Sequence, residues 1–253
     1  FNPKVHFFML SKNQIKRITS LQQKKYRNEY QLFIAEGIKV IQELFQSQYI
    51  AEHFYTTNPD LSISAAPIPE IIAESDLKKI SCLKTPNDCL AVFRIPKQKP
   101  INLTGLVVCL DDVRDPGNLG TIIRLCDWFG VEQLVCSPET ADVYNPKVIQ
   151  ATMGSISRVN LVYTDLCKFL ENTILPVYGA FMEGKNVYES TLPEKAILVL
   201  GNEANGISKL VEAKISSKIS IPRFGQLQKT ESLNVATASA ILLSEFRRNF
   251  SEK

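Results

Sequence analysis

Short apolar runs alternate with amphipathic segments along the second half of the chain. The runs are LVVCL at 106–110, QLVCS at 133–137, RVNLVY at 158–163, LPVYGAFM at 175–182, AILVL at 196–200 and KISIP at 218–222. Segments with helical spacing lie between most of them, at 119–129, 145–154, 165–172, 206–213 and 232–248. Regular alternation of short strands and helices predicts an α/β fold with a largely parallel sheet.

The first part of the chain has a less regular pattern. The stretch LFIAEGIKVIQELFQS, residues 32–47, has apolar spacing that fits an amphipathic helix, whereas EHFYTT at 52–57 and AVFRIP at 91–96 resemble strands. Residues 96–104, PKQKPINLT, hold two prolines and two lysines and few apolar side chains. We therefore expect a domain at 1–95, a linker at 96–104 and a second domain at 105–253.

Composition excludes several classes of protein. No apolar run approaches the roughly 20 residues that a membrane helix needs. The six cysteines form no C-x-x-C pair, which favours free thiols in a reducing, cytoplasmic compartment. The only histidines, His6 and His53, lie in the first quarter of the chain, which argues against metal or triad chemistry built on histidine in the second domain. Because Met9 lies just inside the chain, we expect residues 1–8 to precede the natural start.

Positive charge is concentrated near the N-terminus, although the net charge is only +3. The basic residues of the segment 12–27 are Lys12, Lys16, Arg17, Lys24, Lys25 and Arg27. Such a segment is compatible with a solvated helix face and equally with a surface that contacts RNA phosphates. Composition alone does not choose between the two.

Ligands of parallel sheets bind at the carboxyl ends of the strands, so the polar loops that follow three strands are the candidate sites. The first loop, DDVRDPGNLG at 111–120, has its glycines at the wrong spacing for a dinucleotide or P-loop phosphate site. Asn118 lies in its turn, and Arg124 follows on the predicted helix. A surface ion pair and a functional contact are both open for Arg124.

The second and third loops have similar features. In LVLGNEANGIS, 198–208, Gly201 directly follows a buried strand, where the missing Cβ would permit close approach of a ligand, and Glu203 lies in the loop. In the third, Ser232 is placed as the N-cap of the last predicted helix, whereas Asn234 falls in its first turn without a capping role.

Taken together, these loops closely resemble the three motifs of the SpoU (TrmH-type) RNA ribose methyltransferases of the SPOUT superfamily. The matching residues are N-L-G-T-I-I-R at 118–124, G-N-E-A-N-G at 201–206, I-P at 221–222 and S-L-N-V-A at 232–236. Residues 144–159 are similar to the family's segment between its first two motifs. The F-I-A-E-G stretch at 33–37 resembles the family's accessory substrate-binding domain, which is related to the L30e/L7Ae RNA-binding fold.

The resemblance implies a SPOUT α/β-knot domain, with a C-terminal trefoil knot, that transfers the methyl group of S-adenosyl-L-methionine to a ribose 2′-hydroxyl of RNA. It implies a catalytic set of Arg124, Asn118, Glu203, Ser232 and Asn234. It assigns cofactor binding to Gly201, Ile221, Leu233 and Ala180. It also implies a homodimer and no metal, and it leaves the effect of the longer loop at 226–231 on the cofactor pocket open.

Other functions stay possible on the same fold. The accessory domain favours ribosomal RNA, while a transfer RNA 2′-O-methyltransferase is the alternative. A non-catalytic RNA-binding protein would be expected to lose Arg124, Glu203 or Asn234, and all three are present. An enzyme that uses NAD or ATP would need a phosphate-binding motif that the sequence lacks.

Overall fold

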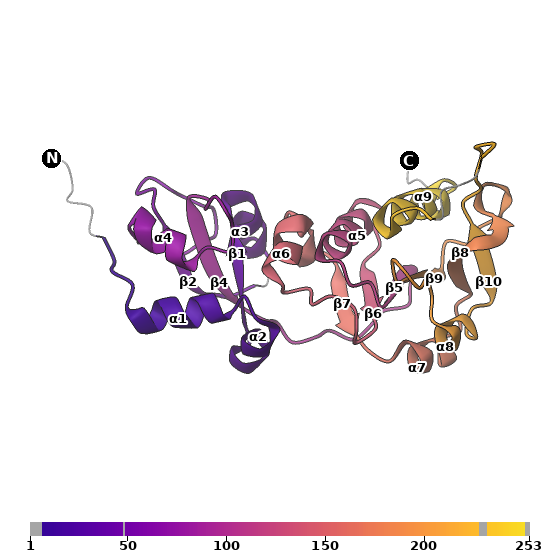
Figure 1. Ribbon diagram of the computed structural model, residues 1–253, viewed down its shortest axis with the longest axis horizontal. Coiled ribbons are helices and arrows are strands. Elements are labelled where there is room, and N and C mark those ends of the chain that lie inside the picture. The colour runs from indigo at the N-terminus through magenta and orange to yellow at the C-terminus, as the bar shows by residue number, and fades with distance from the viewer. Residues whose placement is uncertain (1–6, 48, 228–231, 251–253) are drawn as a thin grey trace. The chain divides into compact units, whose positions relative to one another are not determined.

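The structure is a computed structural model that describes residues 7–47, 49–227 and 232–250. The chain folds into two compact units (Figure 1). Unit 1 comprises residues 1–97 together with 142–157, and unit 2 comprises 98–141 together with 158–253. The expectation about residues 1–8 falls mostly on residues outside this description.

Unit 1 is built around a four-stranded sheet with the order β1-β4-β2-β3. Its strands are β1 (Leu32–Glu36), β2 (Ala51–Thr56), β3 (Glu70–Ile71) and β4 (Cys89–Arg94). Its helices are α1 (Lys12–Ser20), α2 (Lys24–Tyr30), α3 (Ile38–Phe45), α4 (Glu74–Ile80) and α6 (Pro146–Thr152), followed by the 3-10 turn η1 (Ser155–Ser157). β4 pairs antiparallel with both β1 and β2, and the short β3 runs parallel to β2.

The single helix predicted over residues 32–47 is wrong. All five residues of β1 are buried, because the strand pairs with β4 and lies within the unit's core. Gly37 then turns the chain into α3 with φ +88°, a conformation that L side chains rarely adopt. Both elements are rich in apolar residues, so a helical period read across the junction conceals the change from strand to helix.

Residues 142–157 pack within unit 1, although they follow three elements of unit 2 in the sequence. Arg27, only 2% exposed, forms an ion pair with Asp142 at 2.5 Å. A Cβ on Gly154 would come within 2.5 Å of the Glu43 side chain of α3. α6 lies against β1. The chain thus enters unit 2, returns to unit 1 for α6 and enters unit 2 again.

Unit 2 contains a six-stranded sheet with the order β10-β8-β9-β5-β6-β7, and every pair in it is parallel, as predicted. Its strands are β5 (Leu106–Asp111), β6 (Gln133–Cys136), β7 (Asn160–Tyr163), β8 (Val177–Asn186), β9 (Ala196–Gly201) and β10 (Ser217–Ser220). Its helices are α5 (Pro116–Trp128), α7 (Leu166–Glu171), α8 (Lys209–Glu212) and α9 (Val235–Arg247), with the 3-10 turn η2 at Val187–Glu189.

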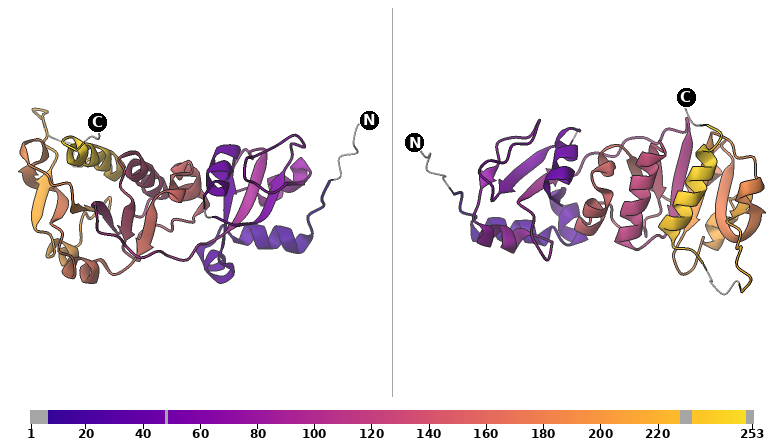
Figure 2. Two further views of the ribbon diagram at one scale, coloured as in Figure 1. Left: turned by 180° about the vertical axis from the view of Figure 1, so that it is seen from behind. Right: turned by 90° about the horizontal axis from the view of Figure 1, so that it is seen from above.

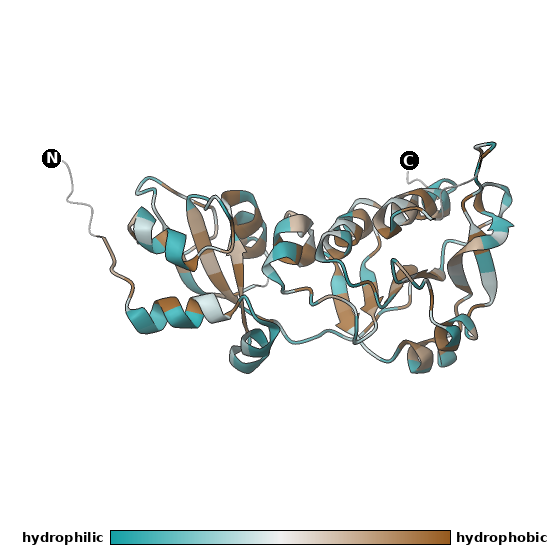
Figure 3. Ribbon diagram, in the orientation of Figure 1, coloured by the Kyte–Doolittle hydropathy of each residue, from teal (hydrophilic) through white to brown (hydrophobic). Residues whose placement is uncertain are grey.

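Helices cover both faces of the unit 2 sheet. α5 and α9 lie side by side over one face, and α7 and α8 lie together over the other (Figure 2). The central strands are apolar along their length (Figure 3), and β5 and the first five residues of β9 are fully buried. Burial on both faces explains why these strands appear in the sequence as continuous apolar runs.

α8 is shorter than the helix predicted from residue 206. Asn202 and Gly206 exchange two backbone hydrogen bonds of 2.9 Å, which close a turn directly after β9 and delay the helix to Lys209. Among the described helices, none combines the length and the apolar character that a membrane crossing requires. All six cysteines are free thiols.

Candidate active site

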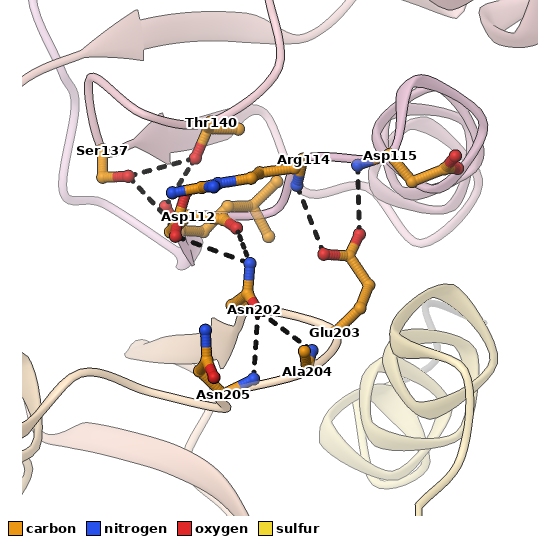
Figure 4. A network of polar contacts seen from close by, with 10 residues as sticks. Asp112, Arg114, Asp115, Ser137, Thr140, Asn202, Glu203, Ala204 and Asn205 are labelled. Carbon is orange, nitrogen blue, oxygen red and sulfur yellow. Dashed lines mark hydrogen bonds and ion pairs between the residues drawn. The ribbon is translucent and has the colours of Figure 1, made fainter.

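The candidate site lies where β5 and β9, two neighbouring parallel strands, reach their carboxyl ends. Asp111, the last residue of β5, is 6% exposed, and its carboxylate accepts a hydrogen bond from the Ser208 backbone N–H at 2.7 Å. Asp112 follows with φ +61°. Its N–H donates to Ser137 Oγ (3.0 Å) and its carbonyl oxygen accepts from Asn202 Nδ2 (2.6 Å). Figure 4 shows these hydrogen bonds, which hold Asp112 in its strained left-handed conformation.

Asp115 then begins α5. Its side chain accepts a hydrogen bond from the Asn118 N–H at 2.7 Å, and Pro116 occupies the first turn. An aspartate N-cap followed by proline is a strong start signal for a helix. The cap holds Asn118 in the first turn of α5.

Glu203, in the loop after β9, connects this turn to the second motif by hydrogen bonds. One carboxylate oxygen accepts hydrogen bonds from Asn118 Nδ2 (3.0 Å) and the Asp115 N–H (3.2 Å). The other accepts from the Arg114 N–H at 3.3 Å (Figure 4). Burial raises the pKa of Glu203, but these hydrogen bonds outweigh burial and hold the pKa below its ordinary value. The carboxylate is therefore ionised at neutral pH and organises the loop.

Asn118 carries the connection on to the third motif. While its amide nitrogen donates to Glu203, its Oδ1 accepts a hydrogen bond from Asn234 Nδ2 at 2.9 Å. One asparagine thus joins the loop after β9 to the start of α9. The three motifs, distant in sequence, meet through the side chains of Asn118, Glu203 and Asn234.

The N-cap of the last helix is Asn234, so the assignment of the cap to Ser232 is wrong. Asn234 Oδ1 accepts from the N–H groups of Ala236 (2.9 Å) and Thr237 (3.2 Å), and α9 begins only at Val235. An asparagine cap satisfies two N–H groups that the helix itself leaves unpaired. Asn234 therefore both starts the helix and contacts the site, while Ser232 lies exposed two residues earlier.

The far ends of the same two helices are also joined. The Arg247 guanidinium donates to the carbonyl oxygens of Phe129 and Gly130, each at 2.8 Å, at the end of α5. Contacts at both ends make α5 and α9 parallel neighbours. A cation at a helix C-terminus is also electrostatically favourable.

Arg124 lies on α5, six residues after Asn118, with an exposed side chain. Within the described part of the chain, no residue forms a hydrogen bond or an ion pair with its guanidinium. A surface ion pair within the described residues is thus not its role. Arg158, by comparison, pairs with Asp127 on the same unit at 2.9 Å.

Two of the residues expected to bind a cofactor, Ala180 and Gly201, lie on the neighbouring strands β8 and β9, where the pairing of these strands has ended. The ladder between β8 and β9 ends at Gly179↔Val199, and the pairing of β8 with β10 skips from Gly179 to Lys185. Ala180 stands at the start of this interruption. Among the described strands, Leu200 and Gly201 pair with β5 only, which leaves backbone polar groups on the β8 side for a ligand.

Gly201 is required by its own loop. A Cβ on this residue would lie 2.2 Å from the carbonyl carbon of Gly206 and 2.3 Å from the Ile207 nitrogen. The missing side chain permits this closed turn, which is a second reason for glycine here; the expected close approach of a ligand stays a prediction. Ile221 is half-buried after β10, and Leu233 is 46% exposed. The longer loop at 226–231 falls mainly on residues 228–231, outside the described residues.

The basic segment of unit 1 divides into two kinds of residue. Five of its side chains are exposed: Lys12, Lys16, Arg17, Lys24 and Lys25. Arg27 is buried, and besides Asp142 it donates to the carbonyl oxygens of Leu21 (2.8 Å) and Gln22 (2.9 Å). The prediction that Arg27 contacts RNA is therefore corrected, because its guanidinium is used within the fold.

Sequence inspection missed several residues of this arrangement. Asn202 lies inside the G-N-E motif, and its position beside Glu203 was the available signal. The sequence contains no such signal for Asp112 or Arg247, because their hydrogen-bond partners are distant in sequence. In the described ranges, no three His, Cys, Asp or Glu side chains are grouped so that they could hold a metal ion.

Models of two known protein families match the chain. The model of the SpoU rRNA Methylase family matches residues 105–244, and that of the MRM3-like substrate binding domain matches residues 12–91. The 23S rRNA (guanosine(2553)-2′-O)-methyltransferase RlmP of Bacillus subtilis is 30% identical over 94% of this chain and 97% of its own.

Two solved structures are similar over nearly the whole chain. A TrmH-family protein from Porphyromonas gingivalis has 42% identity and a TM-score of 0.87, covering 96% of this chain and all of its own. An AdoMet-bound rRNA methyltransferase from Sinorhizobium meliloti has 26% identity and a TM-score of 0.84, covering 96% and 97%.

Proposed function

Because the chain belongs to the SpoU rRNA Methylase family, we propose that it transfers the methyl group of S-adenosyl-L-methionine to a ribose 2′-hydroxyl of ribosomal RNA. The observation that carries the proposal is the junction of Asn118, Glu203 and Asn234, which brings three family motifs to one edge of a parallel sheet. The chain is an RNA methyltransferase, and each residue of the junction has its own role.

The cofactor-binding role falls to the interrupted edge between β8, β9 and β10. Backbone groups near Ala180 and Gly201 offer donors and acceptors for the adenine and ribose, and Ile221 and Leu233 offer apolar surface beside them. This combination of backbone polarity and apolar contact suits an adenosyl group. When bound, S-adenosylmethionine supplies a methyl group made electrophilic by its sulfonium.

Arg124 is assigned to the RNA. Its exposed guanidinium, which has no partner among the described residues, lies on α5, the helix whose first turn contains Asn118. A planar guanidinium binds a phosphate or a developing oxyanion with two N–H groups. Because arginine stays protonated, we assign it orientation and electrostatic stabilisation of the hydroxyl, and not removal of its proton.

Glu203, Asn118 and Asn234 hold the catalytic loop in register. The exposed Ser232 would complete the set by hydrogen bonding to the substrate. The lowered pKa of Glu203 and its three hydrogen bonds fit an organiser better than a general base. Substitution of any of these residues should therefore lower turnover more than cofactor affinity.

Ribosomal RNA is the substrate that the relatives support, since RlmP is named for a 23S rRNA ribose. In unit 1, RNA phosphates would contact the exposed basic side chains Lys12, Lys16, Arg17, Lys24 and Lys25. Because such contacts release counterions, the RNA affinity would depend strongly on salt. We propose residues 1–95, together with residues 142–157 that pack within unit 1, as the RNA-binding domain, 96–104 as the linker and the remainder of 105–253 as the catalytic domain. The free thiols support a cytoplasmic setting.

We also propose a homodimer. The support is Trp128, which is 83% exposed at the end of α5, an unusual exposure for so large an apolar side chain. Light scattering of the purified protein tests this. A dimer that Trp128→Glu converts to a monomer is expected, and a monomeric wild-type protein at micromolar concentration would contradict it.

Calorimetry with S-adenosylmethionine, followed by methyl transfer to ribosomal RNA in vitro, tests the function. We expect a dissociation constant of about 1 μM or below, equivalent to a binding free energy of about −8 kcal/mol. When the methyl group of the cofactor is labelled, we expect the label to be recovered on a ribose of the RNA. Absence of heat with both the cofactor and its demethylated product would exclude the proposed activity.

A further inference from the structure

Glu36, the last residue of β1, is a buried carboxylate that the proposed reaction does not use. It is 4% exposed, and it accepts hydrogen bonds from Ser81 Oγ at 2.5 Å and from the Cys82 N–H at 2.7 Å. A carboxylate has about four acceptor positions, so two stay open. Within the described ranges no cation forms an ion pair with it. A buried charge without a cation is costly unless it has further donors.

The positive charge of Arg27, close to Cys82, is already engaged by other groups. Burial and Glu36 raise the pKa of the Cys82 thiol to about 12, and Arg27 lowers it in part, so both charged groups lie close to Cys82. Arg27 is bound by Asp142 and by two backbone carbonyls. The cluster of Arg27 (+1), Asp142 (−1) and Glu36 (−1) therefore carries a net charge of −1.

A cavity of about 300 Å³ opens beside this carboxylate, between β1, the segment after α4, and α6. We name it the β1–α6 pocket. Its apolar walls include Ile34, Leu83 and Pro146, and its polar lining includes Glu36, Lys147 and Gln150. Lys147 is exposed and Gln150 half-buried, so donors stand across the cavity from the buried acceptor.

The arrangement matches one base edge in particular. Guanine presents two adjacent donors, N1–H and the N2 amino group, beside the acceptor O6, whereas adenine, cytosine and uracil each place an acceptor where guanine has one of those donors. A carboxylate accepts both guanine donors at once, and an ammonium or amide N–H meets O6. Apolar walls suit the flat faces of a purine.

We infer that the β1–α6 pocket binds an unpaired guanine of the RNA substrate, read by Glu36 through N1–H and N2–H and by Lys147 or Gln150 through O6. The inference rests on the proposed function for the identity of the macromolecule. The guanine would be a nucleotide bound in unit 1, separate from the ribose that is methylated. It gives the substrate-binding domain a base-specific contact beside the phosphate contacts of α1 and α2.

Mononucleotide binding to the full chain tests the pocket directly. GMP and IMP differ only by the N2 amino group, so their ratio isolates the contact with Glu36. Titration would be followed by NMR line broadening of the nucleotide, with saturating demethylated cofactor present to occupy the cofactor pocket. We expect GMP to bind about tenfold more tightly than IMP, and AMP and CMP to bind no better than IMP.

Glu36→Gln should remove the preference for GMP. The fold should be kept, because the glutamine oxygen still accepts from Cys82 and its NH2 still donates to Ser81. Lys147→Ala, at an exposed position, should weaken the affinity for GMP a few-fold without affecting folding. The matched control is Glu29→Gln, which changes an exposed carboxylate of the same unit. Should Glu36→Gln fail to fold, two measurements still test the pocket. They are the effect of Lys147→Ala on GMP binding and the ratio of the wild-type affinities for GMP and IMP.

Equal binding of GMP and IMP would overturn the inference, as would an unchanged preference in Glu36→Gln. Either result could accompany normal methyl transfer, in which case only the guanine pocket is refuted. Loss of methyl transfer with GMP selectivity intact would instead refute the proposed function.

Discussion

Arg27 in unit 1 and Arg124 in unit 2 are both arginines on helices, yet they have opposite surroundings. Arg27 is 2% exposed and bound by a carboxylate and two carbonyls. Arg124 is exposed and has no partner among the described residues. A buried, fully bonded guanidinium stabilises the fold, whereas an exposed one beside organised polar loops is available to a substrate. Partners, and not charge, separate the two roles.

The largest effect should come from Arg124. Arg124→Ala should reduce single-turnover methyl transfer by about 10²- to 10³-fold, with cofactor affinity and melting temperature nearly unchanged. Arg124→Lys should fail too, because a point charge does not reproduce a planar two-N–H contact. Arg158→Ala, which breaks an exposed ion pair on the same unit, should keep activity. Near-normal turnover by Arg124→Ala would remove the distinction between the two arginines.

Arg27 should show the reverse behaviour. Arg27→Ala should lower the free energy of unfolding by about 3–5 kcal/mol, because Asp142 is left without its cation. Arg17→Ala, which breaks the exposed pair with Glu52, should cost at most about 1 kcal/mol. Urea unfolding of the two variants gives the comparison. Equal losses would mean that burial does not set the importance of these pairs.

Asn234 tests whether one residue serves helix and site together. Asn234→Ala should lower the free energy of unfolding by about 1 kcal/mol because the cap is removed, and should also lower turnover because Asn118 loses its partner. Ser232→Ala should leave the free energy of unfolding unchanged while lowering turnover. Thermal unfolding and single-turnover rates, measured on both variants, separate capping from catalysis; a stability loss confined to Ser232→Ala would reverse the assignment.

The exposed lysines of unit 1 should change RNA affinity in a salt-dependent way. Replacing Lys12, Lys16, Lys24 and Lys25 by alanine should reduce the slope of log K against log salt by about 0.7–0.9 for each RNA phosphate that is no longer neutralised. Lys78→Ala with Lys79→Ala, exposed positions on α4 of the same unit, is the control. Filter binding across a salt series measures the slope. An unchanged slope would place the RNA surface elsewhere.

Acid should weaken the site through Glu203. Because its pKa is lowered in the fold, its contribution to stability is fully present above the ordinary value of 4.5 and is lost as pH falls through the folded value. Melting temperature followed from about pH 6 to about pH 3 should fall less steeply in Glu203→Gln than in the wild type. Identical curves would show that the hydrogen bonds to Asn118 and the loop backbone do not couple to ionisation.

The sequence predicted unit 2 better than unit 1 for a physical reason. Strands buried on both faces appear as apolar runs, and turns rich in Asp, Pro, Asn and Gly separate them, so the parallel sheet was recognisable. In unit 1, β1 and α3 adjoin with only Gly37 between them, and one apolar stretch concealed two elements.

The site was predictable in its residues and not in its connections. The motifs identified Asn118, Glu203 and Asn234, but their mutual hydrogen bonds join positions 85 and 116 residues apart. The return of residues 142–157 to unit 1, and with it the pairing of Arg27 with Asp142 across 115 residues, left no trace in local spacing. Such contacts depend on tertiary packing, which local periodicity does not encode.

The most direct measurement is a map of 2′-O-methylated riboses in ribosomal RNA from cells that lack the protein, from their parent, and from cells complemented with wild type or Arg124→Ala. Resistance of the adjacent phosphodiester to alkaline hydrolysis reports each methylated ribose. We expect one ribose site that is lost on deletion, restored by the wild-type chain and not restored by Arg124→Ala. Identical maps in the deletion and parent cells, or full restoration by Arg124→Ala, would contradict it.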